Sequence, residues 1–131
     1  MSAAGRANVS VIQGEDFVAQ IFWSDNLNQP YTLCHPAKMQ VRTKRGGLVL
    51  ELSSQSEQAQ GLVLAEEQGL IQVYIPASVT SRLPVGSYSY DLFVTYESRT
   101  TGFGAATQTV QKHVKRVVAG NFNVEDRVTF L

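Results

Sequence analysis

The sequence predicts an all-β protein of about seven to nine short antiparallel strands that pack as two sheets. Apolar side chains recur at alternate positions along most of the 131 residues, so an extended chain would bury one side. Turn-forming residues interrupt this pattern about every ten residues, and no segment has the apolar period of a long helix. The length suits a single domain, residues 1–131, with its own core.

The first strands are expected at residues 8–11 and 17–23, where apolar and polar residues alternate. The Gln-Gly-Glu-Asp segment at residues 13–16 is a tight connection between them. The second strand places Trp23 on its apolar side, which makes Trp23 a core residue. Residues 25–30, rich in Asn and ending in Pro, are expected to form a loop.

Two hairpins are expected in the middle of the chain. Residues 38–42 and 48–52 flank a Lys-Arg-Gly-Gly segment, whose glycines supply the positive φ of a hairpin turn. Residues 62–64 and 70–75 flank a Glu-Glu-Gln-Gly turn in the same way.

A crossover at residues 76–83 leads into the strongest strand pattern. It allows one helical turn, because Pro84 stops any longer helix. After Gly86, alternate apolar residues run from Tyr88 to Tyr96. A Tyr at the start of a strand just after a crossover is typical of the tyrosine corner of immunoglobulin-like sandwiches, where the phenol bonds the crossover backbone. The alternative is that Tyr88 is only half-buried on a strand.

The last third of the chain begins with a weak pattern. Residues 98–109 hold Gly, Ala, Thr and Ser with little apolar content beyond Phe103, which predicts a long, mobile loop. Strands are expected again at residues 110–118 and 120–124, before an apolar terminus at residues 128–131. These segments complete an immunoglobulin-like antiparallel β-sandwich.

Composition excludes several classes of function. Eleven basic residues balance eleven acidic residues, so the positive field that attracts nucleic acid is missing. The only cysteine, Cys34, cannot form an internal disulfide, which favours folding in a reducing cytoplasm. No leader-like segment and no apolar run of about 20 residues is present, so neither a signal peptide nor a membrane partner is expected.

No group of residues has the spacing of a catalytic, metal or cofactor site. His35 and His113 stand far apart, and Cys34 and His35 would point to opposite faces of an extended chain. Gly102-Phe103-Gly104 resembles part of a dinucleotide motif but lacks its last small residue and a βαβ unit. We therefore expect a binding or structural module without cofactor, and not an enzyme.

Two basic clusters leave two interpretations open. Arg42, Lys44 and Arg45 form the first, and residues 112–116 hold the second. They could bind phosphate or a carboxylate-rich partner, or they could be solvated strand edges, where lysine opposes sheet-to-sheet pairing. Alternation along a strand separates Lys112 and Arg116 from the other members of the second cluster.

An ordered series of segments also matches a known pattern. The series comprises residues 12–17, 29–33, 39–42, 50–53, 75–77, Leu83, Gly86, 88–92 and 118–124. In this order they resemble the small immunoglobulin-like virion proteins of tailed bacteriophages, including amino-terminal domains of upper baseplate proteins. No single segment is specific, and the order carries the resemblance.

The resemblance implies a non-catalytic part of a virion, made in the host bacterial cytoplasm and present in several symmetric copies. Its partners would be larger tail, baseplate or head proteins, joined through sheet edges and loops. We expect the loop that holds Arg99 and Phe103, and the terminus with Val128, Phe130 and Leu131, to become ordered against these neighbours.

Two rival functions remain to be compared with this one. The first is a carbohydrate-binding or adhesive module, which needs an exposed aromatic platform, for which Tyr31, Tyr96 and Phe103 are the candidates. The second is a small hydrolase or isomerase, which the sequence opposes because it lacks paired carboxylates and a nucleophile elbow.

Overall fold

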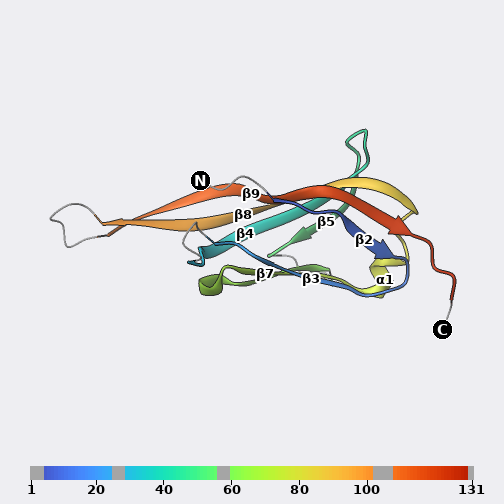
Figure 1. Cartoon of the computed structure of the whole chain (residues 1–131), viewed down its shortest axis with the longest axis horizontal. Coiled ribbons are helices and arrows are strands. Elements are labelled where there is room, and N and C mark those ends of the chain that lie inside the picture. Colours follow the sequence, from blue (N-terminus) through green and yellow to red (C-terminus); the bar gives the residue numbers. More distant parts are fainter. Residues whose placement is uncertain (1–4, 25–28, 56–59, 102–107, 130–131) are drawn as a thin grey trace.

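The computed structural model describes residues 5–24, 29–55, 60–101 and 108–129, with backbone alone at 99–101 and 108–109. This part of the chain is nearly all strand and forms two sheets that pack face to face (Figure 1). The elements in chain order are β1 (Gly5–Arg6), β2 (Val9–Ile12), β3 (Phe17–Phe22), β4 (Thr32–Arg42), β5 (Leu48–Ser53), β6 (Gly61–Ala65), the 3-10 turn η1 (Glu66–Gln68), β7 (Leu70–Ile75), α1 (Ala77–Thr80), β8 (Gly86–Thr101) and β9 (Gln108–Glu125).

The larger sheet has six strands and the smaller sheet has three. Their orders are β1-β9-β8-β4-β5, with β2 also on β9, and β3-β7-β6. All neighbours are antiparallel except β1 and β2, which pair with β9 in parallel. The prediction of a wholly antiparallel sandwich is therefore wrong for this edge. The chain reaches the other sheet through the turn at residues 13–16, so β2 and β3 never pair with each other.

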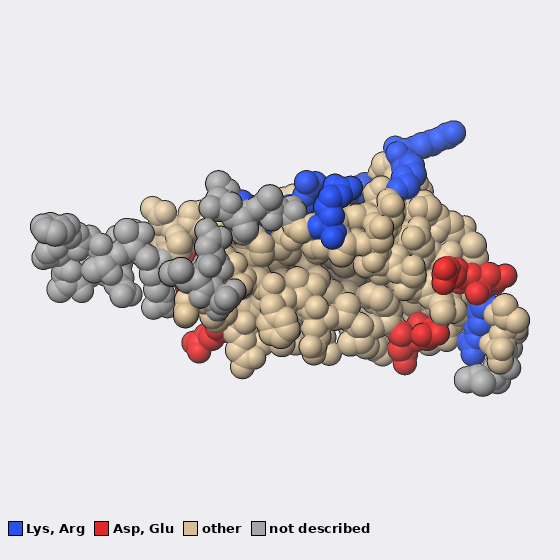
Figure 2. Space-filling model, viewed as in Figure 1, with Lys and Arg blue, Asp and Glu red and all other residues tan. Residues whose placement is uncertain are grey.

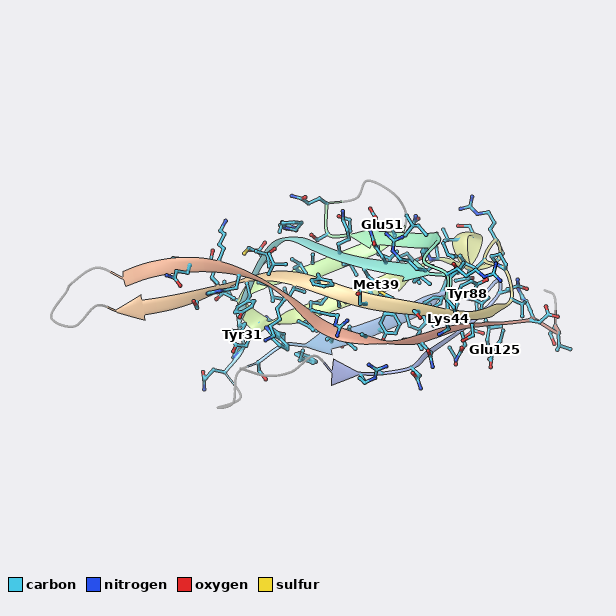
Figure 3. The ribbon with its side chains drawn as sticks, turned by 90° about the horizontal axis from the view of Figure 1, so that it is seen from above. Tyr31, Met39, Lys44, Glu51, Tyr88 and Glu125 are labelled. Atoms are coloured by element: carbon cyan, nitrogen blue, oxygen red, sulfur yellow. The ribbon has the colours of Figure 1, made fainter. Side chains whose placement is uncertain are left out.

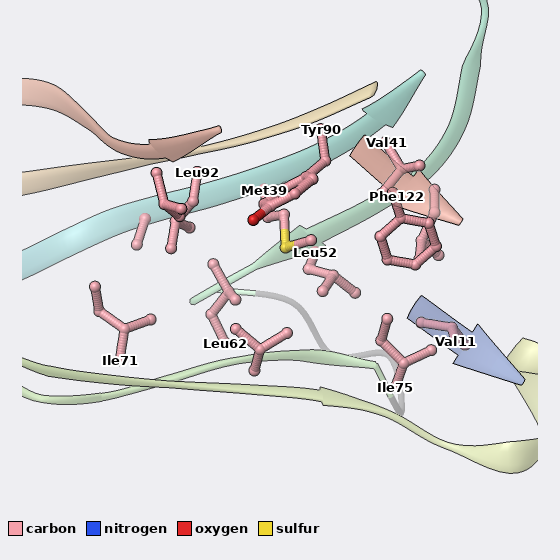
Figure 4. Packing of buried hydrophobic residues seen from close by; sticks show 14 of the residues in the cluster. Val11, Met39, Val41, Leu52, Leu62, Ile71, Ile75, Tyr90, Leu92 and Phe122 are labelled. Carbon is pink, nitrogen blue, oxygen red and sulfur yellow. The ribbon is translucent and has the colours of Figure 1, made fainter. Parts of the chain in front are cut away.

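Side chains of both sheets meet in one core, as the period of two requires (Figure 4). Leu92 and Phe122 come from the larger sheet and Ile71 and Ile75 from the smaller one, and all four are 0% exposed. Burial of such side chains contributes about 1.5 to 3 kcal/mol each, which makes this layer the main source of stability. Trp23 is buried at one end of it, as predicted.

Both predicted hairpins are present, and so is the crossover. The strand pairs β4–β5 and β6–β7 are antiparallel, and α1 is a single turn. After the crossover, Tyr88 is buried and its Oη donates a 2.7 Å hydrogen bond to the carbonyl oxygen of Pro84. The expected bond from the phenol to the crossover backbone is thus formed. Gly86 beside it has a φ of 157°, a conformation that other residues seldom adopt.

The flanks of the segment predicted as a long loop are strands instead. β8 continues to Thr101 and β9 starts at Gln108, so the predicted loop at residues 98–109 is wrong on both flanks, while residues 102–107 lie outside the described part. The missing apolar side chains misled the prediction, because a strand pair with no covering layer needs none. The chain at Cys34 and His35 belongs to β4, where the register shifts between Cys34 and Lys38.

Candidate functional site

The most prominent feature of the molecule is a pair of strands that leaves the sandwich. On one side of β8 lies β4, and their outermost pair is Thr32 and Glu97. On the far side of β9, β1 pairs only from Val118 onward. Beyond Glu97, residues 98–101 pair only with residues 108–111 of β9, and we call these two stretches the ribbon. Figure 1 shows that it extends past the end of both sheets.

A cluster of aromatic rings braces the base of the ribbon. The rings of Tyr31 and Tyr96 lie 4.8 Å apart, and Trp23 stacks on Tyr31 at 5.5 Å. On the other side of Tyr96, the His113 ring stacks at 5.2 Å, and His113 Nε2 lies 2.7 Å from the hydroxyl oxygen of Ser98. The two strands of the ribbon are thus tied to each other and to the core where they leave it.

The ribbon and the adjoining part of β9 expose apolar side chains and a strand edge. Val110 is 48% exposed and Val114 is 71% exposed. Within the described residues, no strand pairs with the outer edge of β9 before Val118. An unpaired edge offers backbone N–H and C=O groups to the strand of another protein.

The structure places only some of the residues predicted to bind partners. Arg99 belongs to the ribbon, where its backbone alone is described. Val128 follows β9 and is 93% exposed. Phe103, Phe130 and Leu131 lie outside the described residues.

The two basic clusters converge on the outer face of the six-stranded sheet. Alternation splits the second cluster as predicted: Lys112 and Arg116 are exposed, whereas His113 and Lys115 lie on the opposite side, half-buried. Arg116 of β9 pairs with Phe93 of β8, and Phe93 pairs on its other side with Lys38 of β4. Strand pairing, which the sequence pattern alone did not give, therefore places Arg116 of the second cluster and Arg42 of the first around one part of this face.

These cations surround a shallow hollow, which we call the basic hollow, with a volume of about 510 Å³. Its walls carry four cationic side chains and one carboxylate, that of Asp91. The cationic residues are Arg6, Lys38, Arg42 and Arg116. Small residues such as Ala119 and Gly120 line it as well, which leaves room between the longer side chains.

The cations of this face differ in how far they are already paired. Lys38 Nζ lies 3.7 Å from Glu51 Oε1, and Lys44 donates to Oδ1 of Asn121, a residue that lines the hollow, at 2.9 Å. Figure 3 labels Lys44 and Glu51. No described residue gives the side chain of Arg6 or Arg116 a hydrogen bond or an ion pair. Two guanidinium groups therefore remain available to an anionic partner.

A Ser-His-Glu arrangement on the surface was not foreseen from the sequence. His35 Nδ1 lies 2.8 Å from Ser54 Oγ, and His35 Nε2 lies 3.5 Å from Glu66 Oε1. Ser54 Oγ also accepts a 2.8 Å bond from the Ala37 N–H, so it joins the irregular part of β4 to the end of β5. A strand register that no local pattern reveals brings these three residues together. They do not line the basic hollow, and we interpret them as a surface brace.

The neighbouring cysteine does not have the properties of an activated nucleophile. Burial raises the pKa of the Cys34 thiol, although the positive charge of Lys112 opposes this shift. The thiolate, which is the nucleophilic form, is therefore disfavoured.

Comparisons with known proteins leave the chain without an assigned family. No family model matches the sequence, and no curated protein matches it either. Among the described residues, no three His, Cys, Asp or Glu side chains gather as metal ligands would. The described part of the chain also has no helix long and apolar enough to cross a membrane.

Proposed function

We propose that the protein is a non-catalytic structural subunit of a tailed-phage virion, which links larger tail, baseplate or head proteins. The observation that carries this proposal is the ribbon, two strands that pair with each other beyond the edge of the sandwich. An isolated two-stranded hairpin is marginally stable in water, so a long exposed one gains most from a neighbour that covers it. The immunoglobulin-like character of the sandwich is part of the same proposal and is supported by the bond from Tyr88 to Pro84.

The partner would add to the free edge of β9 and cover the valines beside it. Val110 and Val114 are exposed there, and Lys112 lies between them. A lone lysine on an exposed edge opposes random edge-to-edge pairing, whereas a partner strand with a carboxylate opposite it would be accepted. The edge thus combines backbone bonding with a means of selection.

Replacement of residues 99–110 by an Asn-Gly turn tests the proposal. The turn would join Ser98 to Gln111, which face each other in the native register, and would leave the aromatic base in place. We expect the shortened protein to fold and to be lost from purified particles. The control Arg45→Asn creates the same Asn-Gly pair at the β4–β5 turn, where residue 46 is already Gly, and should be incorporated normally. Normal incorporation of the shortened protein would refute the proposal.

The carbohydrate-binding alternative gains little support from the geometry. Tyr31 and Tyr96 do lie together, but both are half-buried and pack against Trp23 and His113. Rings in this arrangement brace the ribbon and do not form an open platform for a sugar ring. A glycan array on which wild-type and Tyr96→Ala proteins give the same background signal would remove this alternative.

A further inference from the structure

We propose that the basic hollow is a docking site for a second copy of this chain, which inserts the acidic end of its own sandwich. The acidic end consists of the turn at residues 13–16 and the segment at residues 125–129, which lie together where β9 finishes. This inference deepens the proposed function, because it names one of the partners of the subunit.

The first argument is the separation of charge within a chain whose net charge is zero. The basic hollow carries a net charge of about three positive units, from four cations and Asp91. The acidic end carries Glu15, Asp16, Glu125 and Asp126 against Arg127, which gives about three negative units. Figure 2 shows basic side chains along the upper margin, over the larger sheet, and acidic ones at the right-hand end and lower margin.

The second argument is the availability of these groups. Neither Arg6 nor Arg116 has a carboxylate partner among the described residues. At the acidic end, the Arg127 guanidinium donates to the carbonyl oxygen of Gly14, and no described residue bonds the Glu15 or Glu125 carboxylate. Docking would therefore form new ion pairs between guanidinium and carboxylate groups without breaking old ones.

The third argument is shape and apolar contact. The chain continues past the end of β9, away from both sheets, and Val128 on this projecting segment is 93% exposed (Figure 1). Phe93 is 41% exposed in the hollow. A projecting valine can cover this ring while the flanking carboxylates meet the cations of the walls, which gives the contact an apolar centre and a charged rim.

The two surfaces lie at different places on the molecule, so the contact is head-to-tail. Such a contact repeats from copy to copy and closes into a ring if the rotation allows it, or grows as a filament if it does not. This geometry fits a subunit that is present in several symmetric copies.

Two complementary charge reversals test the inference. One variant carries Arg42→Glu and Arg116→Glu in the hollow, and the other carries Glu15→Lys and Glu125→Lys at the acidic end. We expect the wild-type chain to self-associate at about 0.1 M salt in analytical ultracentrifugation, and to dissociate at about 1 M salt, where screening acts within about 3 Å. Each variant alone should weaken self-association by at least about tenfold. An equimolar mixture of the two should associate again, because the end of one variant, now positive, meets the hollow of the other variant, now negative.

Single reversals outside both surfaces supply the controls. Arg45→Glu lies in the exposed turn between β4 and β5, outside the hollow, and Glu67→Lys lies in η1. Both should self-associate like the wild type. Circular dichroism of every variant would show that the fold is retained.

Three results would overturn the inference. They are a wild-type chain that is monomeric at low salt, variants that associate like the wild type, and a mixture that stays monomeric. Binding of a hexaglutamate peptide or of inorganic phosphate by a monomeric wild type would assign the hollow to another anion and refute docking of a second copy. The ribbon replacement tests the proposed function separately, because it leaves both charged surfaces intact. The failure of one proposal can therefore be distinguished from the failure of the other.

Discussion

The outer faces of the two sheets are built on the same alternation but present opposite chemistry. The larger sheet exposes Lys38, Arg42 and Arg116 around a hollow. The smaller sheet exposes three rows of uncharged residues across β3, β7 and β6. These rows comprise Val18, Tyr74 and Gly61, then Gln20, Gln72 and Val63, then Phe22, Leu70 and Ala65.

The difference teaches that the core constrains only the inward positions of each strand. Both sheets need apolar residues inside, so the period of two is common to them. The outward positions are free to differ, so their residues indicate what kind of partner each face can contact. A charged and hollowed face suits a specific ionic partner, whereas an uncharged face with Phe22 at 68% exposure lacks the means to select one.

The largest expected effect is a loss of stability, which should be large for a ring in the interior and small for a ring on the charged outer face. Phe122→Ala removes a fully buried ring from the core and should lower the free energy of unfolding by about 3 to 5 kcal/mol. Phe93→Ala, on the outer side of the neighbouring strand, should cost less than about 1 kcal/mol. Urea unfolding measures both, and equal losses would mean that the outer ring belongs to the stabilising core.

A smaller effect distinguishes a tyrosine of the interior from one on the uncharged face. Tyr88→Phe removes the hydroxyl that bonds the Pro84 carbonyl and should destabilise the fold by about 1 to 2 kcal/mol. Tyr74→Phe, on β7, is the matched control and should leave the unfolding midpoint unchanged. Equal midpoints for the two variants would show that the bond to the crossover adds no stability.

The pH dependence of Cys34 gives a third test, near the base of the ribbon. Burial raises the pKa of its thiol, so the folded state holds the proton more tightly than the unfolded state does. The associated stability is present below the unfolded pKa and is lost as pH rises through the folded pKa. Alkylation by iodoacetamide should therefore be slower in the native protein than in urea around the ordinary pKa of about 8.5. Equal rates would contradict the assigned burial.

The smallest effect concerns a charge placed on the uncharged face. Val63 is 61% exposed in the middle row, so Val63→Lys should change the free energy of unfolding by less than about 0.5 kcal/mol. The variant should also sediment like the wild type under the same conditions. A variant that sediments only as a monomer would place the self-association surface on the smaller sheet.

Local patterns predicted most of the strands but not the contacts between them. Alternation found β3 and the first half of β8, and turn chemistry found both hairpins, because these signals lie within a few residues of each other. The parallel pairing of β2 with β9 could not be read in this way, since Val9 and Phe122 meet only in the folded chain. The ribbon was not predicted, because most of its residues are polar.

The candidate sites were predicted in part. The two basic clusters were visible in the sequence, yet only strand register places Arg116 beside Phe93 and Lys38. Long-range register also brings Ser54 and Glu66 to His35. The Thr-rich flanks of the predicted loop were the one signal for the ribbon, because β-branched residues favour strands.

Amide hydrogen exchange of the ribbon tests most directly the proposal that this chain links other proteins. In the free chain, the amides of residues 108–111 on the unpaired side of β9 should exchange within the fastest class, while those of Leu92 and Phe122 are protected. In assembled particles the same ribbon amides should become protected by at least about tenfold, since a neighbouring strand would bond them. Equal exchange of the ribbon in the free and assembled states would contradict the account.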